Sequence, residues 1–280
     1  MLQKLPPLLT SETAKNLLDG KNKVSLDLGL SEYMVERKKT RYWLNKEEYV
    51  DHADLEKIAE DDRSIYFVMN QVVYVAAIGG KHFYKLAKTR GAPTLEIDGI
   101  RMHRTKDTTP EKDSSDKLKL LGLDHGRVLD TCMGLGYTAI KAKDNGAEYV
   151  LSFEYEPNVI RIAQLNPWSM DLFNEDNIHN VLGDSFHLVD ALPCNHFDYI
   201  IHDPPRHDSA GHLYGLEFYQ KLAQVIKPYG KMFHYTGEPR SRYRRVNIQK
   251  GIIERLTRAG FEDIEYEPLV MGITCTRDTV

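Results

Sequence analysis

The sequence lacks several features that would narrow its function. No apolar run approaches the roughly 18 residues that a membrane span requires, and residues 1–10 show no apolar segment of the kind found in signal peptides. The three cysteines, Cys132, Cys194 and Cys275, lie far apart and match no zinc-binding spacing. An odd number of isolated cysteines is typical of a reduced protein, so we expect a cytoplasmic protein without a metal site.

An excess of basic residues is also missing. The 280-residue chain has 37 lysines and arginines against 41 aspartates and glutamates, a formal net charge of −4. Proteins that bind nucleic acids usually carry an overall or clustered basic excess. Any contact with RNA or another anion must therefore depend on a local patch. The candidate patch follows the fifth expected strand of the second half and consists of Arg240, Arg242, Arg244 and Arg245.

The pattern of the chain changes near residue 105, although no repeat or low-complexity tract divides it. Residues 1–104 alternate short strands and helices irregularly, which predicts a small α+β module. One role to be expected of such a module is substrate recognition. Residues 105–120 begin with a polar stretch that predicts a linker or an active-site loop. From residue 121 to 280 strand and helix signals alternate regularly, which predicts a Rossmann-like α/β domain.

The expected parallel strands of this domain cover residues 127–131, 149–153, 178–182, 198–202 and 231–235. Two further strands, residues 264–268 and 272–276, leave no room for a helix between them and must pair as an antiparallel hairpin. The sequence therefore predicts a seven-stranded sheet that is parallel except for a C-terminal hairpin at its edge.

The strongest motif follows the first of these strands. Asp130 opens the pattern D-x-x-x-G-x-G, with Gly134 and Gly136, and a helix is expected directly after it. Glycines there permit a tight turn and let a ligand lie against the backbone at a helix N-terminus. The second strand leads to Glu154, whose carboxylate can accept hydrogen bonds from ribose hydroxyls. Asp184 follows the third strand, where an acid can bind an adenine amino group.

These features predict a nucleoside cofactor, and two of them favour S-adenosylmethionine over NAD. The third glycine of the dinucleotide motif G-x-G-x-x-G is replaced by Ala139. Asp130 is placed to meet a cationic amino-acid group rather than a pyrophosphate. The residues expected to bind the cofactor are Asp130, Thr131, Gly134, Gly136, Tyr137, Glu154 and Asp184.

The fourth strand ends in the sequence H-D-P-P-R. Two prolines fix the backbone at the carboxyl end of a strand, where open α/β sheets bind their ligands. We expect the acceptor to be oriented or deprotonated there by Asp203 and His202. The residues expected to form the catalytic site are His202, Asp203, Pro204 and Arg206. The residues expected to contact the substrate are His207, His234, Tyr235 and Arg242.

Taken in order, these motifs resemble those of class I S-adenosylmethionine-dependent methyltransferases over residues 127–237. The segments DTCMGLGYTAI, NVIRIAQLNPWS, IIHDPPR and FHYTGEP resemble, more narrowly, a family of predicted archaeal methyltransferases that includes the N-terminal module. The resemblance implies transfer of a methyl group to a nitrogen, because amine methyltransferases commonly carry D-P-P followed by an aromatic residue. Arg206 stands in the place of that aromatic residue, and it can pair with a phosphate or a carboxylate instead.

Two alternatives stay open at this point. One is an aminopropyltransferase similar to spermidine synthase, which would use decarboxylated S-adenosylmethionine; such enzymes share the small N-terminal domain and an acidic loop after the fourth strand. The other is a non-catalytic module that binds RNA or a protein. For a methyltransferase, the acceptor can be RNA, a protein side chain or a small molecule.

Overall fold

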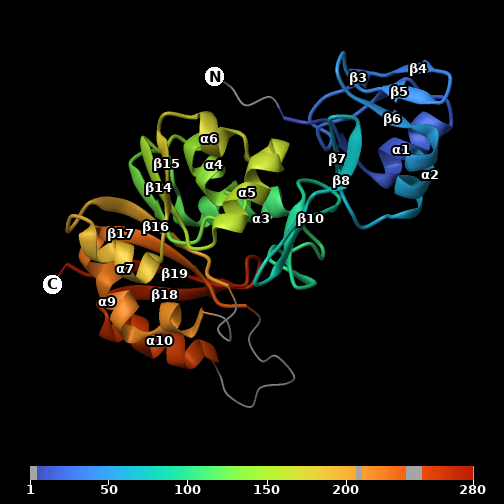
Figure 1. The fold of residues 1–280 in the computed structure, drawn as a ribbon. Helices are drawn as coiled ribbons and strands as arrows, with labels where there is room; N and C mark the ends of the chain where they lie inside the picture. The colour runs from blue at the N-terminus through green and yellow to red at the C-terminus, as the bar shows by residue number, and fades with distance from the viewer. Residues whose placement is uncertain (1–4, 206–209, 238–247, 280) are drawn as a thin grey trace. The chain divides into compact units, whose positions relative to one another are not determined.

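The structure is a computed structural model, and it describes residues 5–205, 210–237 and 248–279. The chain forms two compact units (Figure 1). The first contains Met1–Pro110 together with Asn158–Asn174, and the second contains Glu111–Pro157 and Glu175–Val280. The first unit is therefore not continuous in sequence, because a short segment from the second half of the chain belongs to it.

The first unit is built from short antiparallel sheets packed against two helices, α1 (Ser11–Leu18) and α2 (His52–Glu60). Helix α1 begins where the Thr10 side chain accepts a hydrogen bond from the Thr13 amide, which satisfies one of the free amides of the first turn. Its apolar face and that of α2 bury Leu17 and Leu55 in a common core. The strands of this unit are β1 (Leu8–Leu9), β2 (Lys23–Val24), β3 (Tyr33–Met34), β4 (Glu36–Lys38), β5 (Arg41–Trp43), β6 (Tyr49–Asp51), β7 (Tyr66–Met69), β8 (Val72–Val75), β9 (Ala77–Gly79), β10 (Phe83–Ala87), β11 (Thr94–Ile97) and β12 (Ile100–Arg101).

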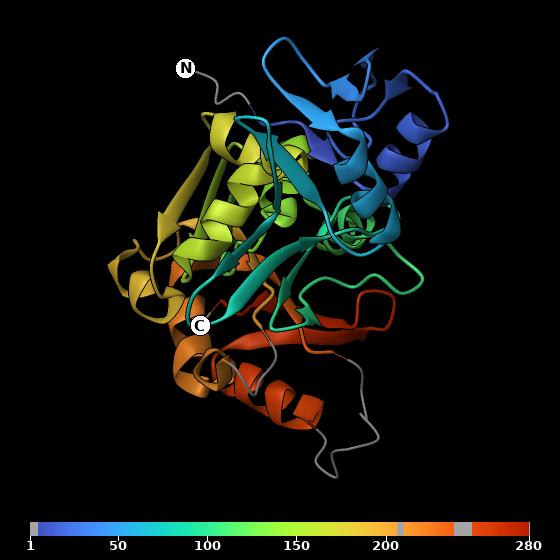
Figure 2. The same ribbon diagram turned by 45° about the vertical axis from the view of Figure 1, so that its right-hand side comes forward.

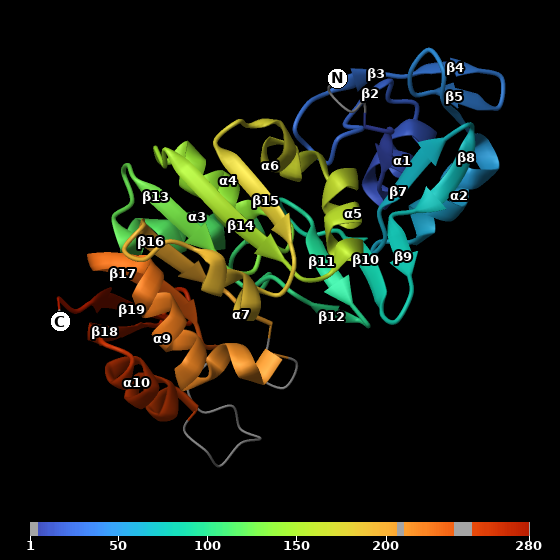
Figure 3. The same ribbon diagram turned by 60° about the vertical axis from the view of Figure 1, so that its left-hand side comes forward.

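The second unit is organised around a seven-stranded sheet with the order β15-β14-β13-β16-β17-β19-β18 (Figure 3). The neighbours from β15 to β17 are parallel, and β19 runs antiparallel to both β17 and β18. The Rossmann-like α/β class is therefore confirmed. The C-terminal hairpin forms as well, with its second strand inserted beside β17 so that its first strand lies at the edge. The strands are β13 (Arg127–Asp130), β14 (Tyr149–Glu154), β15 (Ile178–Leu182), β16 (Phe197–His202), β17 (Ile226–Tyr235), β18 (Phe261–Glu267) and β19 (Gly272–Arg277).

Helices connect these strands. On one face of the sheet, α9 and α10 pack together against β17 and β18 (Figure 2). Phe218 and Leu222 of α9 and Ile252 of α10 are fully buried against Ile200 and Met232 of the sheet. The described helices of the second half of the chain are α3 (Pro110–Leu121), α4 (Tyr137–Asp144), α5 (Pro157–Leu165), η1 (Pro167–Ser169), α6 (Asp171–Asn174), α7 (Ser185–Leu188), η2 (Val189–Ala191), η3 (Gly211–Tyr214), α9 (Leu216–Val225) and α10 (Ile248–Arg258).

Helix α3 occupies most of the segment for which the sequence predicted a linker or a loop, residues 105–120. Proline is favoured at the first position of a helix because its missing amide is not needed there, and Pro110 takes that position. Leu118 and Leu121, which are three residues apart, are fully buried. The polar composition that suggested a loop therefore belongs to a helix whose buried side combines these leucines with Asp113, Ser114 and Lys117.

Candidate active site

The predicted site residues follow the carboxyl ends of four adjacent parallel strands. Asp130 ends β13, Glu154 ends β14, Asp184 comes two residues after β15, and Asp203 comes directly after β16. The amide of Gly183 donates a hydrogen bond to the Glu154 carbonyl, which brings Asp184 beside the end of β14. This is the edge where open α/β sheets bind their ligands.

The glycine loop joins β13 to α4. Gly134 and Gly136 have left-handed backbones, with φ of 55° and 76°, a conformation that residues with a Cβ rarely adopt. A Cβ built on Gly134 would meet nothing within 4 Å, so the backbone of the loop faces open space at that point. The loop is anchored from below, because the Met133 amide donates to the Phe153 carbonyl over 2.7 Å. It therefore presents bare backbone at the N-terminus of α4.

Asp130 lies beneath this loop and is fully buried. Its Oδ2 accepts hydrogen bonds from Ser152 Oγ at 2.8 Å and from Thr138 Oγ1 at 3.3 Å, whereas its Oδ1 makes no regular hydrogen bond within the described part of the chain. Burial raises the pKa of Asp130 to about 6, and the charge of Asp203 adds to the rise. A buried carboxylate oxygen without a partner fits a cationic or N–H donor of a ligand.

Glu154 holds the loop from the neighbouring strand. Its Oε2 accepts a hydrogen bond from the Gly134 amide and its Oε1 one from the Glu156 amide, both at 2.9 Å. Burial raises the pKa of this carboxyl to about 7, with the two amides opposing the rise. A carboxylate oxygen can accept more than one hydrogen bond. Glu154 can therefore hold the loop and still accept from a pair of ribose hydroxyls.

Asp184 has a role of its own in the fold. Its Oδ1 accepts a hydrogen bond from the Phe186 amide at 2.9 Å and so caps α7. His212 Nε2 lies 3.8 Å from the same oxygen. The side chain is 29% exposed, which leaves it accessible for the predicted contact with an adenine amino group.

Asp203 has a partner that the sequence analysis missed. Lys117 Nζ of α3 lies 2.6 Å from Asp203 Oδ2 and 2.8 Å from Asp113 Oδ2, one helical turn before it. The side chains of Lys117 and Asp113 are only 6% and 5% exposed. Asp203 is 27% exposed, and its Oδ1 has no hydrogen bond to the described residues. One oxygen of the carboxylate is thus fixed by a buried cation, and the other is available to a ligand.

The rings of Phe233 and Tyr235 lie beside the same lysine, with Nζ 5.7 and 5.4 Å from their centroids. Tyr235, which we predicted to contact the substrate, therefore packs beside the charge that holds Asp203. The signal for Lys117 was present in the sequence as an acid and a lysine four residues apart, followed by leucines at helical spacing. The polar composition of the segment concealed it.

His202 and His234 do not occupy the roles predicted for them. Both are fully buried, with their rings 4.4 Å apart. His202 Nδ1 accepts from the Thr131 hydroxyl at 2.7 Å, and its Nε2 donates to the Leu213 carbonyl at 3.0 Å. Burial lowers the pKa of His202 to about 4. It is therefore neutral and fully hydrogen-bonded, and it is not placed to take a proton from a substrate.

His234 is held in the same way. Its Nδ1 donates to the His202 carbonyl at 3.3 Å, and its Nε2 accepts from the Tyr219 hydroxyl at 2.9 Å. Burial lowers the pKa of His234 well below its usual value. These bonds link β16, β17 and α9 beneath the site. The prediction that His234 contacts the substrate is therefore corrected to a structural role. Thr131, predicted to bind the cofactor, instead donates its hydroxyl hydrogen bond to His202.

The remaining predicted residues divide into two groups. Tyr137 and Pro204 lie within the described part of the chain, and both are buried. Next to Pro204, the backbone carbonyl of Pro205 accepts a hydrogen bond from the Tyr214 hydroxyl at 3.0 Å. The other predictions concern residues that lie outside the described part of the chain: Arg206, His207, Arg240, Arg242, Arg244 and Arg245.

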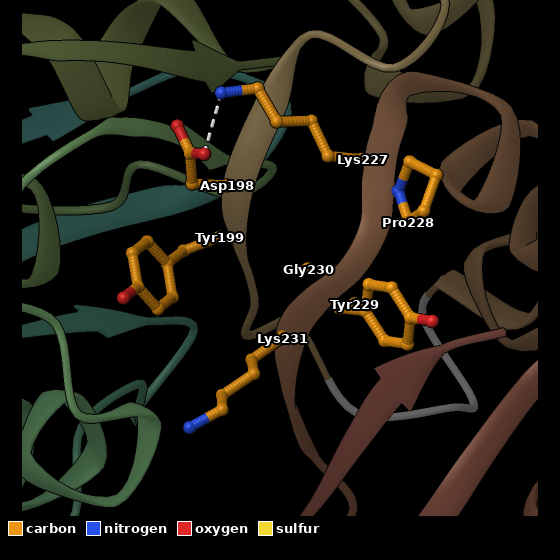
Figure 4. A pocket seen from close by; sticks show the side chains of 7 residues that line it. All are labelled: Asp198, Tyr199, Lys227, Pro228, Tyr229, Gly230 and Lys231. Atoms are coloured by element: carbon orange, nitrogen blue, oxygen red, sulfur yellow. Dashed lines mark hydrogen bonds and ion pairs between the residues drawn. The ribbon is translucent and has the colours of Figure 1, made fainter. Parts of the chain in front are cut away.

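A surface hollow lies at the opposite, amino end of β16 and β17 (Figure 4). Asp198 and Lys227 form an ion pair of 2.6 Å on its wall, and Asp198 also accepts from the Arg127 amide. Its charged groups are thus engaged in holding β13, β16 and β17 together, so the hollow is not our candidate site. Its lining consists of Asp198, Tyr199, Lys227, Pro228, Tyr229, Gly230 and Lys231.

The described residues contain no group of three or more histidine, cysteine, aspartate or glutamate side chains arranged to hold a metal ion. Among their helices, none combines the length and the apolar character needed to cross a membrane.

Comparisons with known proteins give the family. The chain is 40% identical over 281 residues to the uncharacterized protein MJ1233 of Methanocaldococcus jannaschii, a match that covers 96% of this chain and 95% of that protein. The chain belongs to the family of this archaeal protein. No family model matches the chain.

Further matches are more distant. Polyamine aminopropyltransferase 2 of Streptomyces coelicolor is 29% identical over 124 residues, which are 42% of this chain and 22% of that protein. Spermidine synthase from Thermotoga maritima superposes with a TM-score of 0.57 at 21% identity, covering 77% of this chain and 75% of the other. MnmC2 from Aquifex aeolicus gives 0.52 at 17% identity, covering 70% and 71%. At these identities the structural matches show a shared fold.

Proposed function

We propose that the protein is an S-adenosylmethionine-dependent methyltransferase that transfers a methyl group to a nitrogen. The single observation that carries the proposal is the arrangement of three carboxylates at the carboxyl edge of the sheet. Asp130 offers a buried oxygen without a regular partner, Glu154 supports the open glycine loop, and Asp203 presents one free oxygen two strand ends away from Glu154.

Each of these groups has a separate part in the proposed reaction. Asp130 would hold the amino group of the cofactor, the Gly134 backbone would lie along it, and Glu154 would bind its ribose. S-adenosylmethionine, when bound, supplies a methyl group on a positively charged sulfur. Asp203 Oδ1 would accept a hydrogen bond from the N–H of the acceptor and so point the nitrogen toward the methyl group, because positioning contributes much of the rate in such transfers.

The ion pair of Asp203 favours methyl transfer over aminopropyl transfer. A polyamine acceptor carries at least one further positive charge, and enzymes that use it need free carboxylates to hold it. Here Asp203 already shares Lys117, so its charge is partly neutralised and it attracts an ammonium less strongly than a free carboxylate would. A neutral amine nitrogen needs no such attraction.

Aminopropyl transfer is the second candidate, and the comparisons support it. The fold match to spermidine synthase and the partial match to a polyamine aminopropyltransferase both favour it. In that case decarboxylated S-adenosylmethionine would be the cofactor, and the acidic surroundings of Asp113, Asp130 and Asp203 would attract the amine. RNA, a protein side chain and a small molecule are the proposed acceptor classes for methyl transfer.

Calorimetric titration separates these functions. We expect S-adenosylmethionine and S-adenosylhomocysteine to bind with micromolar affinity, and Asp130→Asn and Glu154→Gln to weaken that binding by at least about tenfold, the loss of one charge-assisted hydrogen bond. Asp190→Asn, an exposed acid of the same unit, is the matched control and should bind as the wild type does. A clear preference for decarboxylated S-adenosylmethionine would replace the proposal by aminopropyl transfer. If none of the three compounds binds, methyl transfer and aminopropyl transfer are both rejected.

A further inference from the structure

Strand β8 is an open edge of the first unit. It is the last strand of the sheet β1-β7-β8, and no strand of the described residues pairs with its other side (Figure 3). Ala76, the residue that follows it, donates a hydrogen bond to the Ile65 carbonyl at 2.8 Å, so the even-numbered residues of this stretch bond toward β7. Because the direction of hydrogen bonding alternates along a strand, the backbone groups of Val73 and Val75 point to the open side.

The side chains at this edge are apolar, and several are exposed. Val72, Tyr74 and Val75 are each at least 40% exposed. Tyr74 stacks on Phe67, its cross-strand neighbour in β7, with the ring centroids 5.3 Å apart. Met69 lies opposite Val72 and is exposed as well. An apolar patch therefore extends across the hairpin of β7 and β8 to the open edge of the sheet.

The edge also lacks charge. Residues 70–80 read NQVVYVAAIGG, without a charged side chain, whereas 28% of the whole chain is charged. Proteins commonly protect an edge strand with charges, proline or a bulge, because its open N–H and C=O groups can pair with another strand. Two other edge strands of this chain are protected in this way: β18 has the sequence FEDIEYE and a register shift, and β4 has the charged sequence ERK. The absence of protection on β8 indicates that its edge is used for pairing.

The geometry of this edge fits a second copy of itself. In an antiparallel pairing about a two-fold axis at Tyr74, Val73 of each copy lies opposite Val75 of the other, so the outward-facing residues meet as hydrogen-bonded pairs. Tyr74 lies opposite its own counterpart, and aromatic pairs in this position stabilise a sheet. A two-fold axis brings each charge near it close to an identical charge, so identical strands pair best when they carry none. A partner of another kind would be selected by complementary charge, for which this edge offers no group.

We propose that the chain forms a two-fold symmetric dimer in which β8 pairs antiparallel with β8 of a second copy. Residues 72–76 limit the pairing, because the chain continues after Ala76 as β9 in another sheet, and Tyr74 is the middle of this stretch. The pairing joins the three-stranded sheets of the two copies into one sheet and covers the apolar patch of both. It uses no residue of the candidate active site and requires no cofactor, so it is tested independently of the proposed function.

The oligomeric state of the full chain tests this pairing, measured by sedimentation velocity over a range of protein concentrations. We expect the wild type to dimerise, and Tyr74→Glu and Tyr74→Lys each to weaken the association at least about tenfold, because like charges then face each other across the axis. An equimolar mixture of these two variants should dimerise again, since a glutamate then faces a lysine. Met34→Glu and Met34→Lys are the matched controls, because Met34 is an exposed apolar residue of another strand in the same unit; both should dimerise as the wild type does.

A proline variant tests the contribution of the backbone. Val75→Pro removes an N–H group on the open side and leaves the hydrogen bonds to β7 in place, so it should weaken association while circular dichroism shows an unchanged fold. A wild type that stays monomeric at every concentration would overturn the proposal and assign the edge to a different partner. Folded Tyr74 variants that dimerise normally, a mixture of them that stays monomeric, or a Val75→Pro variant that associates like the wild type would overturn it as well.

Discussion

Lys117 is a buried charge that lies between two carboxylates. Burial lowers the pKa of a lysine, but here the charges of Asp203 and Asp113 outweigh it and raise the pKa of Lys117 above its usual value. The lysine therefore stays protonated wherever the protein is folded. An ion pair of this kind is costly to break from one side, because the remaining charge is left without compensation in a place that water does not reach.

Replacing Lys117 by Met should therefore lower the free energy of unfolding by roughly 3–5 kcal/mol, as measured by urea denaturation. Transfer activity should fall as well, since Asp203 loses the contact that fixes it. Lys119→Met on the same helix changes a lysine that is 71% exposed and should have little effect on either quantity. Adding Asp203→Asn to Lys117→Met should restore part of the stability. A single variant as stable as the wild type would contradict the role of the ion pair.

Asp130 and Glu154 predict how cofactor affinity depends on pH. Their pKa values are raised to about 6 and about 7, so both carboxyls become protonated as the pH falls through this range. A cationic amino group and ribose hydroxyls bind better to the ionised forms. Affinity for S-adenosylmethionine should hence be highest above pH 7 and fall between pH 7 and 5.5. Calorimetry on Asp130→Asn should show a weaker affinity with a smaller dependence on pH; an unchanged dependence would contradict the assignment.

The raised pKa of Asp130 also predicts how the stability of the fold depends on pH. Because the pKa of Asp130 is higher in the folded chain than in the unfolded one, the unfolded state releases its proton first as the pH rises from about 4 to 6. Folding stability should therefore fall over this window by up to ~3 kcal/mol from this residue, and change no further above it. In Asp130→Asn this contribution should be absent, which urea denaturation at pH 4.5 and pH 7.5 can measure against the wild type. Equal pH dependence in both proteins would argue against the raised pKa.

At the scale of elements, the sequence predicts best where backbone conformation decides the structure. The glycine loop between β13 and α4 follows from Gly134 and Gly136, which take the left-handed backbone that other residues avoid. The strands of the sheet follow from apolar runs of regular spacing. Helix α3 was not predicted, because its stability comes from two buried leucines and a buried ion pair with Asp203, 86 residues away. The hydrogen-bond partners of His202 likewise depend on contacts between distant segments.

Gly134→Ala tests the glycine loop. The substitution forces a Cβ into the left-handed conformation, which should cost about 1–2 kcal/mol of stability. It also places a methyl group in the open space over the loop, so binding of S-adenosylmethionine should fall much further than the stability loss explains. Gly20→Ala is the control, because Gly20 has a φ of 88° and equally open space around it, in the first unit. Equal cofactor affinity in both variants would show that the cofactor does not lie against this backbone.

At the scale of the whole molecule, the two units are interleaved along the chain. Residues Asn158–Asn174 leave the second unit after β14, complete the first unit and return before β15. Leu172 of this segment is fully buried, and the Trp168 indole donates a hydrogen bond to the Leu28 carbonyl at 3.1 Å. The division of the chain at residues 104 and 121, which the sequence suggested, does not account for this segment.

A fragment of residues 105–280 should consequently be less stable than the full chain. It retains the whole sheet of the second unit, but the Trp168 indole loses the Leu28 carbonyl to which it donates a hydrogen bond. Loss of such contacts typically costs several kcal/mol, and we expect the midpoint of thermal unfolding to fall by about 10 °C or the fragment to aggregate. A fragment that unfolds at the temperature of the full chain would show that the segment is dispensable.

The interleaved segment also sets an order of events during synthesis. A domain that is continuous in sequence can fold as soon as its last residue has emerged from the ribosome. The first unit cannot do so, because its last residues are made only after β13 and β14. The unit must wait, without the helices of this segment, while about 50 residues of the second unit are translated, roughly three to ten seconds at 5–20 residues per second. Neither unit can therefore be completed, exchanged or lost without affecting the other, and a family with this arrangement is expected to inherit both together.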